Sequence, residues 1–141
     1  MVRLMTTFHL ERSRFDIRHF YEWLGYNWGE HIGTWLDMYG DRRDKQVHRV
    51  CIIAPRDHSK STTLRVKILH QLLFEKWRGK PFTIWLFSAN KDLAMNRLDE
   101  IRQDLKRHPE LSKKIDTTKG NRFELRLTNG AWIKATSVGS G

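Results

Sequence analysis

The chain has a single cysteine and no long apolar run, and each scarcity removes a class of protein. Cys51 has no second cysteine to pair with, so an intrachain disulfide is excluded and a reducing compartment fits the composition. No apolar stretch approaches the roughly 20 residues of a membrane-spanning helix. Residues 1–10 lack the apolar core of a signal peptide. We therefore expect a soluble, intracellular chain with no membrane partner.

Acidic residues are also scarce. The 141 residues hold 16 Asp and Glu against 26 Lys and Arg, which gives a net charge of +10. So basic a chain is expected to attract polyanions, nucleic acid first. Its 39% hydrophobic and 11% aromatic residues suffice for the core of one compact domain. The histidines are scattered without the spacing of zinc ligands, so no zinc site is predicted.

Two glycines are missing from the stretch that organises the chain. After a short, mostly apolar run at residues 49–53, the sequence reads Ala54-Pro55-Arg56-Asp57-His58-Ser59-Lys60-Ser61-Thr62. The usual phosphate-binding loop has the pattern G-x-x-x-x-G-K-[ST], and Ala54 and Ser59 replace its two glycines. The order remains typical of a strand, a phosphate-binding loop and a helix.

The residue types of this loop carry specific chemistry. Lys60 would place its ammonium against the β- and γ-phosphates of a nucleotide, and the Ser61 hydroxyl would ligate Mg²⁺. Backbone N–H groups at the start of the helix, and the helix dipole, would favour the same phosphates. The alternative is an ordinary helix N-terminus, since Ser and Asp are common N-caps and Pro55 fits a turn.

Three residues inside the loop allow more than one interpretation. Arg56 would either sense the γ-phosphate and stabilise transition-state charge, or act as an exposed cation or a contact to DNA phosphate. Asp57 and His58 have the residue types of a catalytic pair, but no positioned serine or cysteine nucleophile accompanies them. We interpret them as solvent-facing loop residues.

The segment before the loop is rich in aromatic residues from position 16 to position 39. Asp16 is a predicted N-cap, and the glycines at residues 25–29 divide the segment into two predicted helices. Its aromatic rings either pack in a core or stack on bases or an adenine, and packing is the preferred interpretation. Residues 41–48 are a polar connector.

After the loop, hydrophobic periodicity predicts a helix that ends near residues 78–81. Residues 82–87 have the composition of a strand covered on both faces. Asn90 caps a second helix that His108-Pro109 closes, and this order implies a parallel sheet with right-handed crossovers. Residues 122–127 and 131–135 then alternate around Asn129-Gly130, which predicts an appended antiparallel hairpin.

These blocks together resemble the N-terminal part of the P-loop ATPase domain of bacteriophage large terminase subunits. Residues 54–62 resemble the family's deviant Walker A with its internal arginine. Residues 83–94 resemble the second strand with its following helix, and residues 127–135 resemble the hairpin before the family's Gly-rich loop. The resemblance implies an α/β fold: a P-loop NTPase-like partial parallel sheet with flanking helices. We expect the chain to form one truncated domain with three regions: a helical segment at 1–47, a strand–loop–helix–strand–helix region at 48–121, and a hairpin with terminal loop at 122–141.

The resemblance implies an ATPase that packages double-stranded DNA into a procapsid. Its implied partners are a portal protein, a small terminase subunit and further copies in a homo-oligomeric ring, in the host cytoplasm at the procapsid. ATP and Mg²⁺ are the implied cofactors. Residues 54–62 are the implied nucleotide contacts, with Ser61 on Mg²⁺ and Arg56 as the γ-phosphate sensor or cis-acting arginine.

In the family, the Walker B strand, the catalytic glutamate, the coupling motif and a nuclease domain follow the point where this sequence stops. We therefore expect a fragment that binds nucleotide weakly and does not hydrolyse ATP alone. Gln46 lacks the setting of an adenine-contacting glutamine. Arg102, Lys106 and Arg107 are candidate DNA contacts, although a solvated helix face is the preferred interpretation.

Two other functions remain open from the sequence. One is another P-loop NTPase, such as a helicase-like or recombinase-like motor, because fold alone does not separate these motors. The other is a non-catalytic basic module for nucleic-acid binding or assembly, with a degenerate phosphate loop. The missing glycines, the charge of +10 and the absence of an acidic strand end favour this second function.

Overall fold

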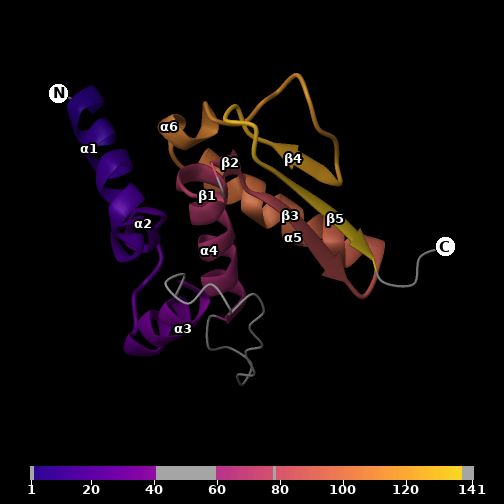
Figure 1. Cartoon of the computed structure of the whole chain (residues 1–141), viewed down its shortest axis with the longest axis horizontal. Helices are drawn as coiled ribbons and strands as arrows, with labels where there is room; N and C mark the ends of the chain where they lie inside the picture. Colours follow the sequence, from indigo (N-terminus) through magenta and orange to yellow (C-terminus); the bar gives the residue numbers. More distant parts are fainter. Residues whose placement is uncertain (1, 41–59, 78, 138–141) are drawn as a thin grey trace. The chain divides into compact units, whose positions relative to one another are not determined.

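The computed structural model describes residues 2–40, 60–77 and 79–137 (Figure 1). The fold is mixed α/β, with helices and a three-stranded mixed sheet, which confirms the predicted class at this level. The chain divides into two compact units, Met1–Ile68 and Leu69–Gly141. Among the described helices, none combines the length and apolar character needed to cross a bilayer.

The first unit is helical. It contains α1 (Val2–Phe15), α2 (Ile17–Trp23), α3 (Glu30–Gly40) and the beginning of α4 (Lys60–Phe74). The predicted cap of α2 is confirmed, because the Asp16 carboxylate accepts from the backbone N–H groups of Arg18 at 3.0 Å and His19 at 3.3 Å. The predicted break at residues 25–29 separates α2 from α3. α1 lies within the helical segment predicted at 1–47, although no separate helix was predicted before residue 16.

Aromatic residues of this segment form the core of the first unit. Phe20 and Tyr21 are buried on α2, and Leu24, the C-cap of α2, and Ile32 of α3 are buried as well. The Tyr21 ring meets the Trp28 ring edge to face, with centroids 5.5 Å apart. For these residues the packing interpretation is confirmed, because buried aromatic pairs stabilise a core through their large apolar area.

The end of α4 differs from the prediction. The helix ends at Phe74, short of residues 78–81. Instead, β1 (Lys76–Trp77) and β2 (Lys80–Pro81) form a minimal antiparallel pair. Gly79 lies between them with φ +77°, a conformation that glycine adopts without steric cost. The glycine that predicted a helix end therefore serves a hairpin turn.

The second unit is built on a sheet with strand order β3-β5-β4. β3 (Thr83–Ser88) pairs in parallel with β5 (Trp132–Ser137), and β4 (Glu124–Arg126) pairs antiparallel with β5. The predicted hairpin is confirmed, and Gly130 lies in its loop with φ +94°. The predicted strand at residues 49–53 lies outside the described residues, as does the connector at 41–48.

The parallel strands are linked through α5 (Lys91–Lys106). Its predicted cap is confirmed, since the Asn90 side chain accepts from the backbone N–H of Leu93 at 2.8 Å. The His108-Pro109 pair follows the end of α5 as expected. Pro109 also begins a short helix, α6 (Pro109–Ser112), which the sequence analysis did not predict. Proline favours the first position of a helix because its missing N–H has no intrahelical partner there.

One face of this sheet packs on α5, which contacts all three strands. The buried apolar residues that make this core are Ala94, Leu98, Ile101, Leu105, Leu125, Ile133 and Ala135. The helical residues recur at three- and four-residue intervals, so they form one stripe along α5. Burying each large aliphatic side chain contributes about 1.5–3 kcal/mol.

The other face of the sheet is not covered as predicted. Along β3 the side chains alternate, and Trp85 and Phe87 are 54% and 62% exposed. The expectation of a strand covered on both faces is therefore wrong for the described structure, because α5 covers one face and no described helix of this unit covers the other. We call this second surface the open sheet face. The register places on it Thr83, Trp85, Phe87, Glu124, Arg126, Trp132, Lys134 and Thr136.

Candidate functional site

The predicted phosphate-binding residues are described only in part. Residues 54–59, which include Ala54, Ser59 and Arg56, lie outside the described residues, as does the side chain of Lys60. The predicted helix is described from Lys60 to Phe74 as α4. In its first turn Ser61 is exposed and Thr62 is half-buried. The Ser61 hydroxyl is thus accessible, as a metal-ligating side chain at this position requires.

The first turns of α4 are held by aromatic residues of the first unit. Thr63 is buried and its side chain is hydrogen-bonded to Tyr21. Burial raises the pKa of the Tyr21 hydroxyl, and the Thr63 hydrogen bond and the nearby Arg65 oppose this rise. The Arg65 guanidinium donates to the Tyr26 hydroxyl at 2.8 Å and lies 5.6 Å from the centre of its ring. These contacts fix the face of α4 that points inward and leave Ser61 on the accessible side.

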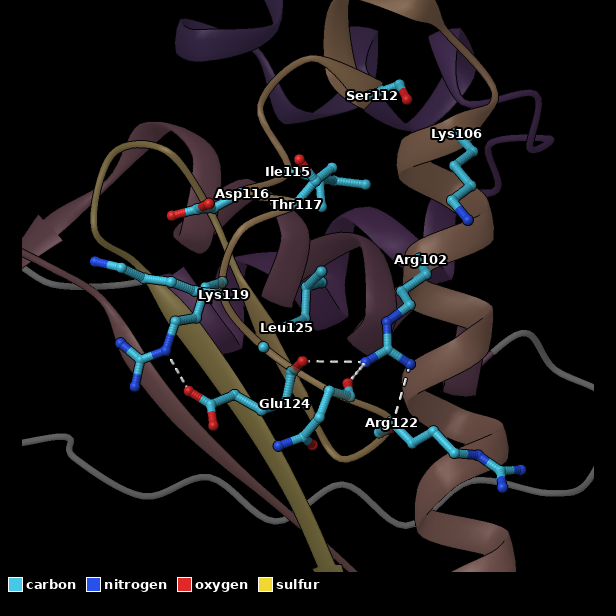
Figure 2. Close-up of a pocket in the computed structure, with 13 residues that line it drawn as sticks. Arg102, Lys106, Ser112, Ile115, Asp116, Thr117, Lys119, Arg122, Glu124 and Leu125 are labelled. Atoms are coloured by element: carbon cyan, nitrogen blue, oxygen red, sulfur yellow. Dashed lines mark hydrogen bonds and ion pairs between the residues drawn. The ribbon is translucent and has the colours of Figure 1, made fainter.

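A second site lies in the sheet unit, where a basic pocket of about 410 Å³ opens beside β4 (Figure 2). Its wall combines the C-terminal half of α5 with the chain from residue 112 to residue 126. Five cationic side chains and two carboxylates line it: Arg102, Lys106, Lys119, Arg122 and Arg126, with Asp116 and Glu124. The excess of positive charge suits an anion.

Arg102 holds the wall of the basic pocket together. Its guanidinium donates to the backbone carbonyl oxygen of Asn121. It also donates to the carbonyl oxygens of Arg122 at 3.2 Å and Glu124 at 3.1 Å, as Figure 2 shows. On α5 the same group bonds Asp99 at 2.9 Å. A planar guanidinium with five N–H donors is suited to such a cluster of carbonyls, so Arg102 is a structural clamp.

The two carboxylates of the basic pocket are also committed to local structure. Asp116 accepts from the backbone N–H of Thr118 at 3.0 Å and from its hydroxyl at 2.6 Å. These hydrogen bonds, the hydroxyl first, lower the pKa of Asp116. Glu124 forms an ion pair with Arg126 on the same strand. Neither carboxylate cancels the charge of Lys106 or Arg122, which make no ion pair within the described residues.

The three candidate DNA contacts predicted near the end of α5 therefore fall into two groups. Arg102 and Lys106 line the basic pocket, whereas Arg107 pairs with Asp104 at 3.4 Å. Lys119 and Arg122, which also line the pocket, were not predicted as site residues. Gly120 lies between them in the same loop. Its φ is +97°, and a Cβ atom there would clash with the Glu124 carbonyl oxygen, so a larger residue would not fit without a shift. Only the spacing of Arg102 and Lys106, one helical turn apart, could have indicated this site.

No protein-family model matches the chain, and a search of the curated proteins finds no match. Within the described residues, no group of three or more His, Cys, Asp or Glu side chains could hold a metal ion. A site formed by one hydroxyl and bound phosphates would not require such a group.

Proposed function

We propose that the chain is the N-terminal part of the ATPase domain of a bacteriophage large terminase, and that residues 54–62 bind ATP with Mg²⁺. The observation that carries this proposal is that Lys60 and Ser61 lie in α4, whose described residues begin at Lys60, and that Ser61 is accessible. A phosphate loop requires its lysine and hydroxyl in the first turn of a helix that continues well beyond them. The 15 residues of α4 meet this condition.

Each residue has a defined part in the proposed site. Lys60 neutralises the β- and γ-phosphates, and Ser61 offers its hydroxyl to Mg²⁺. Backbone N–H groups at the start of α4 donate to phosphate oxygens, with the helix dipole favouring negative charge there. Arg56 is the proposed γ-phosphate sensor. Bound ATP would supply the phosphoanhydride whose hydrolysis powers DNA translocation.

The sheet unit supports the same proposal. The parallel strands β3 and β5 are connected through the capped helix α5, then α6 and the antiparallel strand β4, and a helix between parallel strands is a feature of α/β folds. The β4–β5 hairpin follows in the order that the terminase resemblance requires. Double-stranded DNA, a portal protein, a small terminase subunit and a ring of identical chains are the partners that this proposal entails.

The proposal includes binding without turnover. Phosphoryl transfer to water needs an acidic residue for Mg²⁺ and a group that positions the attacking water. In this sequence no strand-like apolar run ends in an acidic pair. We therefore expect this chain to retain bound ATP unhydrolysed.

Calorimetric titration with a non-hydrolysable ATP analogue tests the site. We expect binding in wild type and in Lys113→Ala, an exposed lysine of the sheet unit, and loss of binding in Lys60→Ala. Equal affinities in all three proteins would refute a phosphate role for Lys60. Sustained, Lys60-dependent release of phosphate from ATP would refute binding without turnover.

The basic pocket favours a second candidate function, a non-catalytic module that binds nucleic acid. Phosphate contacts made by several cations weaken steeply with salt. Salt-sensitive DNA binding that neither nucleotide nor Lys60→Ala alters would support this function. DNA affinity that changes with bound nucleotide would instead support the motor.

A further inference from the structure

The open sheet face carries aromatic side chains, whereas the solvent-exposed face of a sheet usually carries polar side chains. The rings of Trp85 and Phe87 are stacked 6.2 Å apart, with an interplanar angle of 26°. The Trp132 ring meets Trp85 edge to face at 5.9 Å. Both residues of the stacked pair are more than half exposed. Leaving such apolar area in water is costly, so a contiguous aromatic patch indicates a binding surface.

A cation lies within this aromatic patch. The Lys134 ammonium is 4.5 Å from the centre of the Trp132 ring and 5.6 Å from that of Trp85. Cation–π attraction holds it beside the rings. Glu124 is its cross-strand neighbour in the register, but within the described residues Lys134 makes no ion pair. The patch is therefore aromatic and positively charged, which suits a ligand with both flat rings and negative charge.

The open sheet face continues into the basic pocket. Arg126 of β4 lies opposite Trp132 of β5 in the strand register, and it also lines the basic pocket. Lys106, which projects from α5, and Arg122, in the loop before β4, line the same pocket (Figure 2). One side of the sheet thus presents aromatic rings, and the adjoining edge presents a concave basic surface.

We propose that the open sheet face binds a single-stranded nucleic acid, with bases stacked on Trp85, Phe87 and Trp132. The phosphates follow Lys134 and Arg126 toward the basic pocket. Non-specific single-strand binders combine these two elements, a cationic groove for the backbone and aromatic platforms for the bases. This inference does not depend on the phosphate loop, because none of its residues belongs to residues 54–62.

The chemistry favours a single strand over other occupants. In a duplex the bases are stacked on one another and their faces are not available to side chains. A protein partner would be expected to cover an apolar core depleted of charge, whereas Lys134 lies in the middle of this patch. The net charge of +10 further favours a polyanion.

Fluorescence anisotropy of the full chain with labelled oligothymidylate longer than about 16 nucleotides tests the proposal. We expect Trp85→Ala and Phe87→Ala each to weaken binding by about fivefold or more. Trp85→Phe keeps a stacking ring and retains most of the affinity. Phe15→Ala is the matched control, because Phe15 is 85% exposed on α1 of the other unit and should not affect binding.

Separate variants test the proposed contact between Lys134 and phosphate. We expect Lys134→Gln to weaken binding and to reduce the salt dependence by about one phosphate contact. Lys113→Gln, outside both the basic pocket and the open sheet face, should leave the salt dependence unchanged. If an alanine variant fails to fold by circular dichroism, Lys134→Gln and Trp85→Phe carry the test.

Three results would overturn the proposal. The first is unchanged affinity in Trp85→Ala, Phe87→Ala and Lys134→Gln. The second is an unlabelled duplex competing as well as the unlabelled single strand. The third is self-association that Trp85→Ala abolishes while oligothymidylate does not bind, which would assign the face to a second copy of the chain. Binding of the ATP analogue should be the same in Trp85→Ala and wild type, which separates this test from that of the phosphate loop.

Discussion

Arg126 on β4 and Trp132 on β5 are directly opposed in the sheet, so the wall of the basic pocket and the aromatic patch meet at this pair. Cross-strand neighbours in an antiparallel pair lie within side-chain contact distance. The Arg126 guanidinium, which is ion-paired with Glu124 on the same strand, and the Trp132 ring can therefore face adjacent groups of one ligand. This arrangement does not require any residue of the phosphate loop.

Truncation of Leu98 should destabilise the sheet unit strongly. Leu98 is fully buried on α5. We expect Leu98→Ala to lower the free energy of unfolding by about 2–5 kcal/mol, because it removes apolar contacts and leaves a cavity. Leu93→Ala, on an exposed part of the same helix, should cost far less. Urea denaturation of the two variants measures the difference, and similar losses would contradict the packing of α5 on the sheet.

Replacement of Arg102 should loosen the loop that closes the basic pocket. Arg102→Ala leaves three backbone carbonyl oxygens without their charged donor. Hydrogen bonds to charged groups contribute about 1.5–3 kcal/mol each in favourable settings, and water replaces part of this at an accessible loop. Faster amide hydrogen exchange at residues 119–124 should follow, while Arg97→Ala should not alter it. Unchanged protection in Arg102→Ala would contradict the clamp.

The Asp16 cap should contribute measurably to the first unit. Asp16→Ala removes the acceptor for two N–H groups at the start of α2. Loss of an N-cap typically costs about 1 kcal/mol. Asp16→Asn keeps an acceptor and should recover most of this loss in a urea titration. Equal destabilisation by both substitutions would indicate that charge, rather than the cap, is the main contribution.

The first unit should lose stability in mild acid. His9 Nδ1 and His19 Nε2 are 2.8 Å apart, and burial, followed by the charges of His9 and Arg12, lowers the pKa of His19 from 6.5. Asp16 and Glu22 oppose this shift. Because the unfolded chain then binds more protons, stability is fully present above pH 6.5 and falls as the pH drops toward the lower folded pKa.

Urea titrations between about pH 8 and pH 5 measure this dependence. His19→Gln should reduce the slope of unfolding free energy against pH. A stability that rises as the pH falls through this window would contradict the lowered pKa of His19.

Local chemistry explains which elements could be predicted from the sequence. The caps at Asp16 and Asn90 and the turn at Asn129-Gly130 each depend on a few adjacent residues, and all three are confirmed. The early end of α4 was not predictable, because Gly79 serves equally as a helix stop or a hairpin turn. Local patterns of this kind cannot show which of the two the rest of the fold favours.

Non-local geometry limited prediction of the candidate sites. The clamp of the basic pocket joins Arg102 to carbonyl oxygens about 20 residues later, which no periodicity encodes. The apolar run at residues 82–87 suggested burial on both faces, but only the sheet order and the position of α5 reveal the open face. The phosphate-binding role of residues 54–62 stays a prediction from sequence.

The most direct test of that role is the Mg²⁺ dependence of ATP-analogue binding in wild type and Ser61→Ala. The proposed site predicts that Mg²⁺ strengthens binding in wild type and that this gain is lost when the exposed Ser61 hydroxyl is removed. Thr118→Ala, which alters a hydroxyl of the sheet unit, should keep the gain. Binding that is indifferent to Mg²⁺, or a full Mg²⁺ effect in Ser61→Ala, would contradict a phosphate-binding loop at the start of α4.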